Sequence, residues 1–187
     1  MPAPPETKPG HSPKHDLAER ARKIELLLLD VDGVLTDGSI IYSAAGIEIK
    51  RFHVRDGSGL KFWHGHGKRS AIISGRRSEA VERRARELGI APVFQGCAAK
   101  LLALDALLAE TELRPEQICA IGDDLPDLPI LRRSGLAVSV ADGCAEVRAA
   151  ADYVTPNSGG HGAVRDAVEW LLRLQGHWDS TVAEFHR

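Results

Sequence analysis

Short apolar runs alternate with longer amphipathic stretches along most of the chain. Five runs are nearly all apolar, stop at a polar residue or a glycine, and have the length of buried strands: 25–31, 70–74, 91–95, 117–122 and 135–140. Four longer stretches instead repeat apolar residues at helical spacing: 79–89, 98–110, 127–135 and 162–174. Gly89 and Gly135 stand where helix C-terminal caps are expected. The pattern therefore predicts repeated switching between strand and helix.

This alternation predicts the fold class. Consecutive parallel strands are joined by right-handed crossovers, which place helices on both faces of the sheet. We therefore expect an α/β fold with a doubly wound, Rossmann-like parallel sheet. The expected division is a disordered leader over 1–15, a single domain over 16–175 whose first helix spans 16–22, and a polar C-terminal tail over 176–187.

Residues 39–54 break the alternation directly after the first predicted strand. They form two apolar stretches joined at 44–46, before any crossover helix, and predict a β-hairpin inserted near the carboxyl edge of the sheet. The alternating apolar residues of the hairpin are Ile40, Tyr42, Ile47 and Ile49. Such alternation predicts one apolar face, which is covered either by another subunit or by packing within the chain.

Composition narrows the class of protein. The formal net charge is −2 with both signs interleaved, so the basic surface of a general nucleic-acid binder is not expected. No apolar run reaches the roughly 18 residues of a membrane span, and the first residues lack the apolar core of a signal peptide. Cys97, Cys119 and Cys144 are too widely spaced for a disulfide framework or a structural zinc site, which favours a reducing cytoplasm.

Two groups of acidic residues follow predicted strands. Asp30 and Asp32 end the first strand, and Asp123, Asp124 and Asp127 follow a later one. Because ligands of open α/β sheets bind outside the carboxyl ends of the strands, both groups are expected at one site. Neighbouring carboxylates repel each other unless a cation lies nearby, and Mg²⁺ prefers oxygen ligands. A single Asp-x-Asp is more often a capped turn, but two such groups favour a magnesium site.

Ser74 and Lys100 stand in the right order to join these acids. Ser74 ends a predicted strand, where its hydroxyl and nearby amides can hold phosphate oxygens, and Lys100 opens a helix. Each has an ordinary explanation when taken alone, a helix cap for Ser74 and a solvated surface residue for Lys100. Their order relative to the acids favours a phosphate site.

The segments DVDGVLTDG, ISGR, a helix-borne lysine and GDDLPD, in this order, resemble the four motifs of the haloacid dehalogenase superfamily of phosphatases. The resemblance covers about residues 25–174. It implies that Asp30 is a nucleophile that forms an aspartyl phosphate and that Asp32 is the general acid and base. It also implies that Ser74 and Lys100 cradle the phosphoryl group during transfer.

The same resemblance implies a Mg²⁺ cofactor. Asp30, Asp123 and the backbone carbonyl of Asp32 would bind the ion directly, and Asp124 and Asp127 would act as outer-shell partners. Only the hairpin separates the first two motifs, so the chain resembles the subgroup that has no cap domain.

Within this subgroup, the segments FHVRDGSGL, QGCAAK, ADYVT and SGGHGAVRD resemble the 3-deoxy-D-manno-octulosonate 8-phosphate phosphatase family. The resemblance implies a hydrolase of lipopolysaccharide biosynthesis that releases phosphate from this small acidic sugar phosphate. The substrate-binding residues it implies are Asp32, His53, Val54, Arg55, Asp56, Gly57, Lys61, Arg76, Arg84 and Lys100. His53 replaces the usual Asn, and Lys61 and His161 each replace a usual Arg.

Family members form homotetramers whose hairpins meet centrally, so the resemblance implies a homotetramer and favours a subunit contact for the hairpin. A phosphatase for a related nine-carbon keto-acid sugar phosphate is the alternative enzyme, because the same cations would bind either acid. A phospho-aspartate signalling module is the alternative from another class, but its motifs would come in the opposite order, and an inactive binding module would lack a motif residue. His64 and His66 are expected on the surface rather than on a metal.

Overall fold

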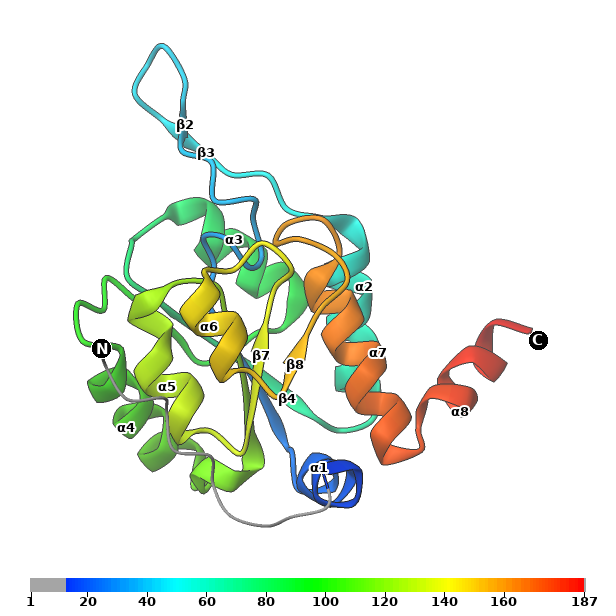
Figure 1. The fold of residues 1–187 in the computed structure, drawn as a ribbon. Coiled ribbons are helices and arrows are strands. Elements are labelled where there is room, and N and C mark those ends of the chain that lie inside the picture. The colour runs from blue at the N-terminus through cyan, green and yellow to red at the C-terminus, as the bar shows by residue number, and fades with distance from the viewer. Residues whose placement is uncertain (1–12, 187) are drawn as a thin grey trace.

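The computed structural model describes residues 13–186, and its centre is a six-stranded parallel sheet (Figure 1). The strands lie in the spatial order β5-β4-β1-β6-β7-β8, and each neighbouring pair is parallel. Their bounds are β1 Leu26–Leu29, β4 Arg69–Ser74, β5 Val93–Gln95, β6 Ile118–Gly122, β7 Leu136–Ser139 and β8 Tyr153–Val154. The predicted α/β fold with a doubly wound parallel sheet is confirmed.

The four consecutive leucines of the sequence form the central strand β1. Leu26–Leu29 are all fully buried because helices cover both faces of the sheet at this strand. Leu27 packs in the apolar cluster that contains Val168, whereas Leu28 packs in the opposite cluster with Leu104. Alternate residues of one strand thus supply two cores.

Helices cover both faces of the sheet (Figure 1). On the first face lie α1 Pro13–Arg22, α2 Val54–Gly65, α3 Glu79–Leu88 and α7 Ala163–Gln175. On the opposite face lie α4 Lys100–Thr111, α5 Leu128–Arg133 and α6 Ala145–Ala150. Two 3-10 turns, η1 Pro115–Gln117 and η2 Leu125–Asp127, flank β6. Within residues 13–186 no helix combines the length and apolar character needed to cross a membrane.

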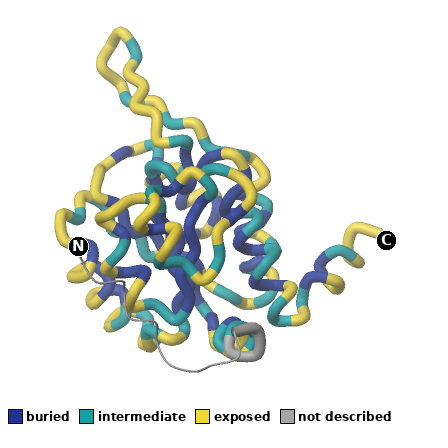
Figure 2. Tube along the Cα trace, in the orientation of Figure 1, coloured by how far each residue is buried: buried dark blue, intermediate teal, exposed yellow. Residues whose placement is uncertain are grey.

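The predicted hairpin is present and projects from the body of the molecule (Figure 1). It consists of β2 Ile41–Tyr42 and β3 Glu48–Ile49, which pair antiparallel as a separate two-stranded sheet. Figure 2 shows most of it exposed. Its exposed apolar residues are Ile40, Ile41, Tyr42, Ile47 and Ile49. These apolar side chains are therefore not covered by packing within the described chain. Tyr42 pairs with Glu48 and Ile41 pairs with Ile49, so the prediction that Ile40, Tyr42, Ile47 and Ile49 form one apolar face is wrong.

The structure differs from the prediction at one helix boundary and contains elements that were not predicted. Helix α1 begins at Pro13 rather than at residue 16, and the rest of the predicted leader, residues 1–12, lies outside the described residues. Strand β8 was not predicted because its two residues carry too short a pattern. The expected tail contains α8 Trp178–Ala183 and η3 Glu184–His186. Trp178 is 9% exposed, so burial of this aromatic ring against the domain accounts for the ordered segment.

The two predicted glycine caps have different outcomes. Gly89 caps α3 in the left-handed conformation, with φ 71°, as predicted. Helix α5 instead ends at Ser134 in extended conformation, so the prediction of a left-handed cap at Gly135 is wrong. A Cβ atom on Gly135 would lie 2.3 Å from the backbone oxygen of Glu116, and this close approach of two chain segments is what requires glycine there.

Candidate active site

The two acidic loops meet where the winding of the sheet changes side. β1 and β6 are neighbours, with Leu29 opposite Ile121, so Asp30 and Asp123 follow adjacent strands at the carboxyl edge. From β1 the chain goes to one side of the sheet, through β4 and β5, and then to the other side, through β6, β7 and β8. Such a topological switch point is the usual ligand site of an open α/β sheet.

A cavity of about 270 Å³ opens at this point. The residues that line it are Asp30, Asp32, Ser74, Gly75, Arg76, Lys100, Asp123, Asp124, Pro126 and Asp127. All the residues predicted from strand ends and helix starts are therefore brought together. A larger hollow of about 580 Å³ beside α3 and β5 contains none of them. We favour the smaller cavity as the candidate site because, among residues 13–186, acids and a buried lysine converge only there.

Three carboxylates form a compact cluster at the floor of the cavity. Asp30, Asp123 and Asp127 each offer an oxygen within 4.8 Å of the others. Asp123 Oδ1 is buried and has no hydrogen-bond partner among the described residues. A buried, unsatisfied carboxylate oxygen is costly unless a cation or donor meets it. The oxygen donor set and the unsatisfied atom together fit Mg²⁺, which binds through a few carboxylates and retains waters.

Lys100 supplies positive charge to the same cluster. Its Nζ lies 3.0 Å from Asp30 Oδ1 and 2.6 Å from Asp127 Oδ1, and its side chain is 7% exposed. Lys100 is the first residue of α4, so the helix start fixes where the side chain enters the site. A buried ammonium requires such pairing, because desolvation alone would favour its neutral form.

Burial and mutual repulsion determine the proton affinity of these groups in the metal-free protein. Burial and the Asp127 carboxylate raise the pKa of Asp30 to about 6, against the opposing effect of Lys100. Burial, Asp30 and Asp127 raise the pKa of Asp123 to about 7. Burial tends to lower the pKa of Lys100, but the adjacent Asp30 and Asp127 carboxylates raise it above its usual value. The cluster thus attracts a further cation.

Asp124 and Asp127 have different environments despite being predicted as one pair. Asp127 is 1% exposed, and its Oδ2 accepts hydrogen bonds from the backbone N–H groups of Asp123 and Asp124, at 3.0 and 3.3 Å. Asp124 is exposed, and its Oδ1 accepts from Leu125 N at the start of η2. Asp127 therefore braces the acidic loop from within the carboxylate cluster, while Asp124 lines the cavity mouth.

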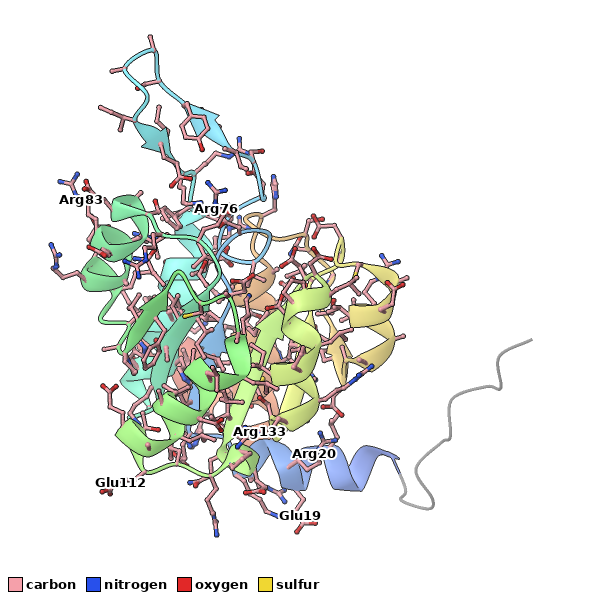
Figure 3. All side chains as sticks on the ribbon, turned by 90° about the vertical axis from the view of Figure 1, so that its left-hand side faces the viewer. Glu19, Arg20, Arg76, Arg83, Glu112 and Arg133 are labelled. Carbon is pink, nitrogen blue, oxygen red and sulfur yellow. The ribbon has the colours of Figure 1, made fainter. Side chains whose placement is uncertain are left out.

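Asp32 lies in the cavity wall, outside this cluster, and contacts the hairpin. Its Oδ1 is ion-paired with Lys50 Nζ, and its Oδ2 lies 3.6 Å from Arg76 Nε. Arg76 also pairs with Glu48 Oε1, at 2.7 Å. Figure 3 shows Arg76 beside the base of the hairpin, at the opposite end of the molecule from Arg20. The sequence prediction missed Glu48 and Lys50; their only signal was the charged alternation with Ile47 and Ile49.

The predicted substrate-binding residues do not all reach the cavity. Asp32, Arg76 and Lys100 line it. His53 and Arg55 instead line a second cavity of about 260 Å³, together with His161. The His53 Nδ1 atom is buried there without a hydrogen-bond partner in the described chain. The predicted set is therefore divided between two places in one chain.

The remaining predicted substrate-binding residues have structural contacts or are exposed on α2. Asp56 is 1% exposed, and its Oδ1 accepts from Arg165 N at 2.8 Å, which ties α2 to α7. Burial, more than any neighbour, raises the pKa of Asp56. Gly57 lies against the guanidinium of Arg84, which also pairs with Glu87. Val54 and Lys61 are exposed on α2.

The predicted surface histidines lie away from the carboxylate cluster. His64 Nε2 is hydrogen-bonded with Ser70 Oγ, and His66 Nε2 with Thr181 Oγ1, at 2.7 and 2.8 Å. Among residues 13–186, no metal-type group of three side chains includes either histidine. Both histidines are half-buried rather than fully exposed, since their rings join α2 to neighbouring segments.

Known proteins resemble this chain in sequence and in structure. Residues 90–167 match the model of the haloacid dehalogenase-like hydrolases. The chain is 44% identical to the 3-deoxy-D-manno-octulosonate 8-phosphate phosphatase KdsC of Escherichia coli K12 over 164 residues, which covers 88% of this chain and 87% of that protein.

Two crystal structures of similar proteins agree with this match. One is a 3-deoxy-D-manno-octulosonate 8-phosphate phosphatase from Moraxella catarrhalis in complex with magnesium, phosphate and KDO, with 43% identity, a TM-score of 0.89, and coverage of 94% of this chain and 99% of that one. The other is a phosphatase of the same name from Yersinia pestis, with 43% identity, a TM-score of 0.85, and coverage of 88% and 89%. The chain therefore belongs to the 3-deoxy-D-manno-octulosonate 8-phosphate phosphatase family of haloacid dehalogenase-like hydrolases.

Proposed function

We propose that this chain hydrolyses 3-deoxy-D-manno-octulosonate 8-phosphate to the free sugar acid and phosphate, with Mg²⁺ as cofactor. The observation that carries the proposal is the convergence of Asp30, Asp123 and Lys100 on one cavity whose wall holds Asp32. Similarity to the Escherichia coli and Moraxella catarrhalis phosphatases supports this choice of substrate. The structure of the latter contains magnesium, phosphate and KDO. A place in lipopolysaccharide biosynthesis follows from that substrate.

The residues around the cavity support a reaction in two steps. In the first, an Asp30 oxygen attacks phosphorus, the bond from phosphorus to the sugar oxygen breaks, and Asp32 donates its proton to the leaving oxygen. In the second, Asp32 takes a proton from water, which attacks the phosphorus of the aspartyl phosphate and releases phosphate and the Asp30 carboxylate. Lys100 and Ser74 hold the phosphoryl oxygens.

The metal is assigned to Asp30, Asp123 and the backbone carbonyl of Asp32. Bound Mg²⁺ would neutralise charge on the phosphoryl oxygens and on the carboxylates. The short distances within the Asp30, Asp123 and Asp127 cluster support this assignment. Asp127 keeps its role as an outer partner, because its Oδ1 is paired with Lys100 and its Oδ2 with backbone amides.

The substrate class is a small phosphate ester that carries a carboxylate. Arg76 is the cavity cation, apart from Lys100, that can meet the substrate anion. His53 and Arg55, in the second cavity, are further candidates for binding the sugar acid. A nine-carbon keto-acid sugar phosphate carries the same groups and stays the alternative substrate.

The test measures phosphate release from both sugar phosphates, with Mg²⁺ and with EDTA. We expect faster turnover of the eight-carbon substrate, and its loss in EDTA. Asp30→Asn should abolish turnover, whereas Asp105→Asn, an exposed change on α4, should not alter it. Retained activity in Asp30→Asn would reject the covalent mechanism. Preference for the nine-carbon substrate would select the alternative, and an aspartyl phosphate that persists for minutes would favour a signalling module.

We also propose a homotetramer with contacts made by the hairpin. The exposed apolar residues of the hairpin support this, since Tyr42 is 60% exposed and Ile47 is 65% exposed. Light scattering coupled to gel filtration should give a tetramer mass for the natural chain and a lower mass for Ile47→Lys. Leu102→Lys is the control, because Leu102 is an exposed apolar residue on α4, outside the hairpin.

We propose a cytoplasmic location for the enzyme. The thiols of Cys97, Cys119 and Cys144 are all free, which suits a reducing compartment. Fractionation of cells that express the chain should recover it with cytoplasmic markers, and recovery with periplasmic markers would contradict the proposal.

A further inference from the structure

We propose that Lys50, on the projecting hairpin, is a positioning residue that orients the Asp32 carboxylate for proton transfer to the leaving oxygen. The proposal rests on the proposed phosphatase function and adds a residue to it. Lys50 follows β3, so it reaches the cavity wall from outside the main sheet.

The Lys50 ammonium is held tightly in one place. The side chain is 2% exposed, and its Nζ is ion-paired with Asp32 Oδ1. A second carboxylate oxygen, Glu48 Oε1, lies 3.8 Å from the same Nζ. A lysine is rarely buried to this degree unless its charge is paired, because desolvation of the ammonium is costly. The pairing with Asp32 is therefore what holds this side chain at the site.

The two oxygens of Asp32 have different neighbours. Oδ1 is taken by Lys50, whereas Oδ2 lies 3.6 Å from Arg76 Nε, beyond normal hydrogen-bond distance. Glu48 holds Arg76 by accepting from its Nη2 at 2.7 Å. The arrangement therefore leaves Oδ2 as the oxygen that can carry the proton, while the contact at Oδ1 restricts the rotation of the carboxylate.

The two faces of the hairpin differ, because Tyr42 lies opposite Glu48 on one face and Ile41 lies opposite Ile49 on the other. Glu48 and Lys50 are two residues apart and point to the same side, where both pair with cavity residues. Ile47 and Ile49 alternate with them and are 65% and 47% exposed. A hairpin that served only as a subunit contact would not need a buried lysine and a glutamate that meet the acid and the arginine of the cavity.

The Asp32 carboxylate has to be held in place because neighbouring negative charges would push it away. The Asp30, Asp123 and Asp127 carboxylates lie together on the floor of the same cavity and, until a cation neutralises them, repel a further carboxylate. The Lys50 charge on the hairpin side opposes this repulsion. General acid catalysis depends on geometry first, since the acid must lie within hydrogen-bond reach of the leaving oxygen.

The experiment uses two substrates that differ in their need for a proton on the leaving group. Loss of the sugar alkoxide requires proton donation, whereas p-nitrophenolate leaves without it. Lys50→Met keeps most of the length of the side chain and removes its charge. We expect kcat/KM for the sugar phosphate to fall by about 10- to 100-fold and kcat/KM for p-nitrophenyl phosphate to change by less than about threefold. Lys50→Arg should restore most of the loss.

Lys23→Met is the matched control, because Lys23 is exposed at the amino edge of the sheet, after α1, and should leave both rates unchanged. Thermal melts followed by circular dichroism identify a folding defect in Lys50→Met. If there is one, the two kcat/KM values are compared between Lys50→Arg and Lys50→Gln instead. Equal losses on both substrates, or no loss, would overturn the Lys50 proposal in an active enzyme. An inactive natural chain on the sugar phosphate would instead overturn the proposed function, and the Lys50 proposal with it.

Discussion

The Lys100 ammonium bridges the nucleophile candidate and the loop acid, with Nζ 3.0 Å from Asp30 Oδ1 and 2.6 Å from Asp127 Oδ1. One buried positive charge thus joins the loop after β1 to the loop after β6. Three clustered carboxylates and one lysine leave an excess of negative charge on the cavity floor. This arrangement supports the proposal that the site receives both a metal cation and, through Lys100, a phosphate oxygen.

Replacement of Lys100 by methionine tests the role of this charge. We expect kcat of Lys100→Met on the sugar phosphate to fall by about 100- to 1000-fold, since one charge-stabilising donor is lost. We also expect the metal-free variant to lose about 3 kcal/mol in free energy of unfolding at pH 8, because Asp30 and Asp127 keep their buried charges without the positive charge that pairs them.

Steady-state kinetics and urea unfolding measure the two effects of Lys100→Met. Lys23→Met removes an exposed lysine and should change neither quantity. Mg²⁺ should restore part of the lost stability, because the ion supplies positive charge to the same carboxylates. A variant with natural kcat would show that Lys100 does not act on the phosphoryl group.

The affinity for Mg²⁺ should rise with pH. Burial raises the pKa of Asp30 to about 6 and that of Asp123 to about 7 in the metal-free protein, so both hold protons that the ion must displace. Below these pKa values the apparent affinity should increase roughly tenfold per pH unit for each proton released. Calorimetric titrations at about pH 5.5, 6.5 and 7.5 measure the slope. A flat profile would contradict these proton affinities.

The free energy of unfolding of the metal-free protein should fall as pH rises, whereas the affinity for Mg²⁺ should increase. A carboxyl group with a raised pKa binds its proton more tightly in the folded state than in the unfolded one. Its stabilising contribution is present at low pH and is lost as pH rises from the ordinary aspartate pKa of 3.8 through about 7 for Asp123. Asp123→Asn removes this titration, so the natural chain should lose stability relative to Asp123→Asn over that window.

Much of the catalytic site could be predicted from sequence because it depends on strand ends. Asp30 and Asp123 end adjacent parallel strands, and a parallel sheet brings such ends to one edge whatever the lengths of the connections. Ser74 and Lys100 lie in the same cavity for the same reason. Side-chain identity and strand order were sufficient for these residues.

The rest of the site depends on information that is not local in the sequence. Lys50 reaches Asp32 and Glu48 reaches Arg76 only because the base of the hairpin lies beside the cavity, and alternation alone does not give that position. Strand β8 has two residues, too few for a periodic signal. The tail helix α8 forms where Trp178 packs against Phe62, a contact between segments more than a hundred residues apart. Tertiary packing, rather than local propensity, determines these features.

The close approach of Gly33, in the loop after β1, to Asp123 leads to a further prediction. It has φ +87°, and a Cβ atom there would lie 2.2 Å from Asp123 Oδ2. Gly33→Ala should therefore displace Asp123 and lower Mg²⁺ affinity by at least about tenfold, in addition to the roughly 1 kcal/mol cost of a left-handed alanine. Gly46→Ala is the matched control, because Gly46 has φ +76° and nothing within 4 Å of such a Cβ. Equal Mg²⁺ affinities in the two variants would contradict the prediction.

The contact of α8 with the domain should weaken as pH falls. The rings of His66 and His177 stack with centroids 4.7 Å apart, and His66 Nε2 is hydrogen-bonded with Thr181 on α8. Burial, followed by the neighbouring His177, lowers the pKa of His66 below the ordinary histidine value of 6.5. A group whose folded pKa is lowered binds protons more readily when released, so its stabilising contribution is lost as pH falls below about 6.5.

Hydrogen exchange of the α8 amides measures this effect. We expect exchange, corrected for the intrinsic pH dependence, to accelerate between about pH 7 and pH 5 in the natural chain. In His66→Gln, which keeps a hydrogen-bonding side chain without the titration, the corrected rate should stay nearly constant. Amides of β1 are the internal control, because that strand lies in the centre of the sheet and opens only with the whole domain. Acceleration of α8 and β1 together would show global acid unfolding, and the stacked histidine pair would then have no local effect.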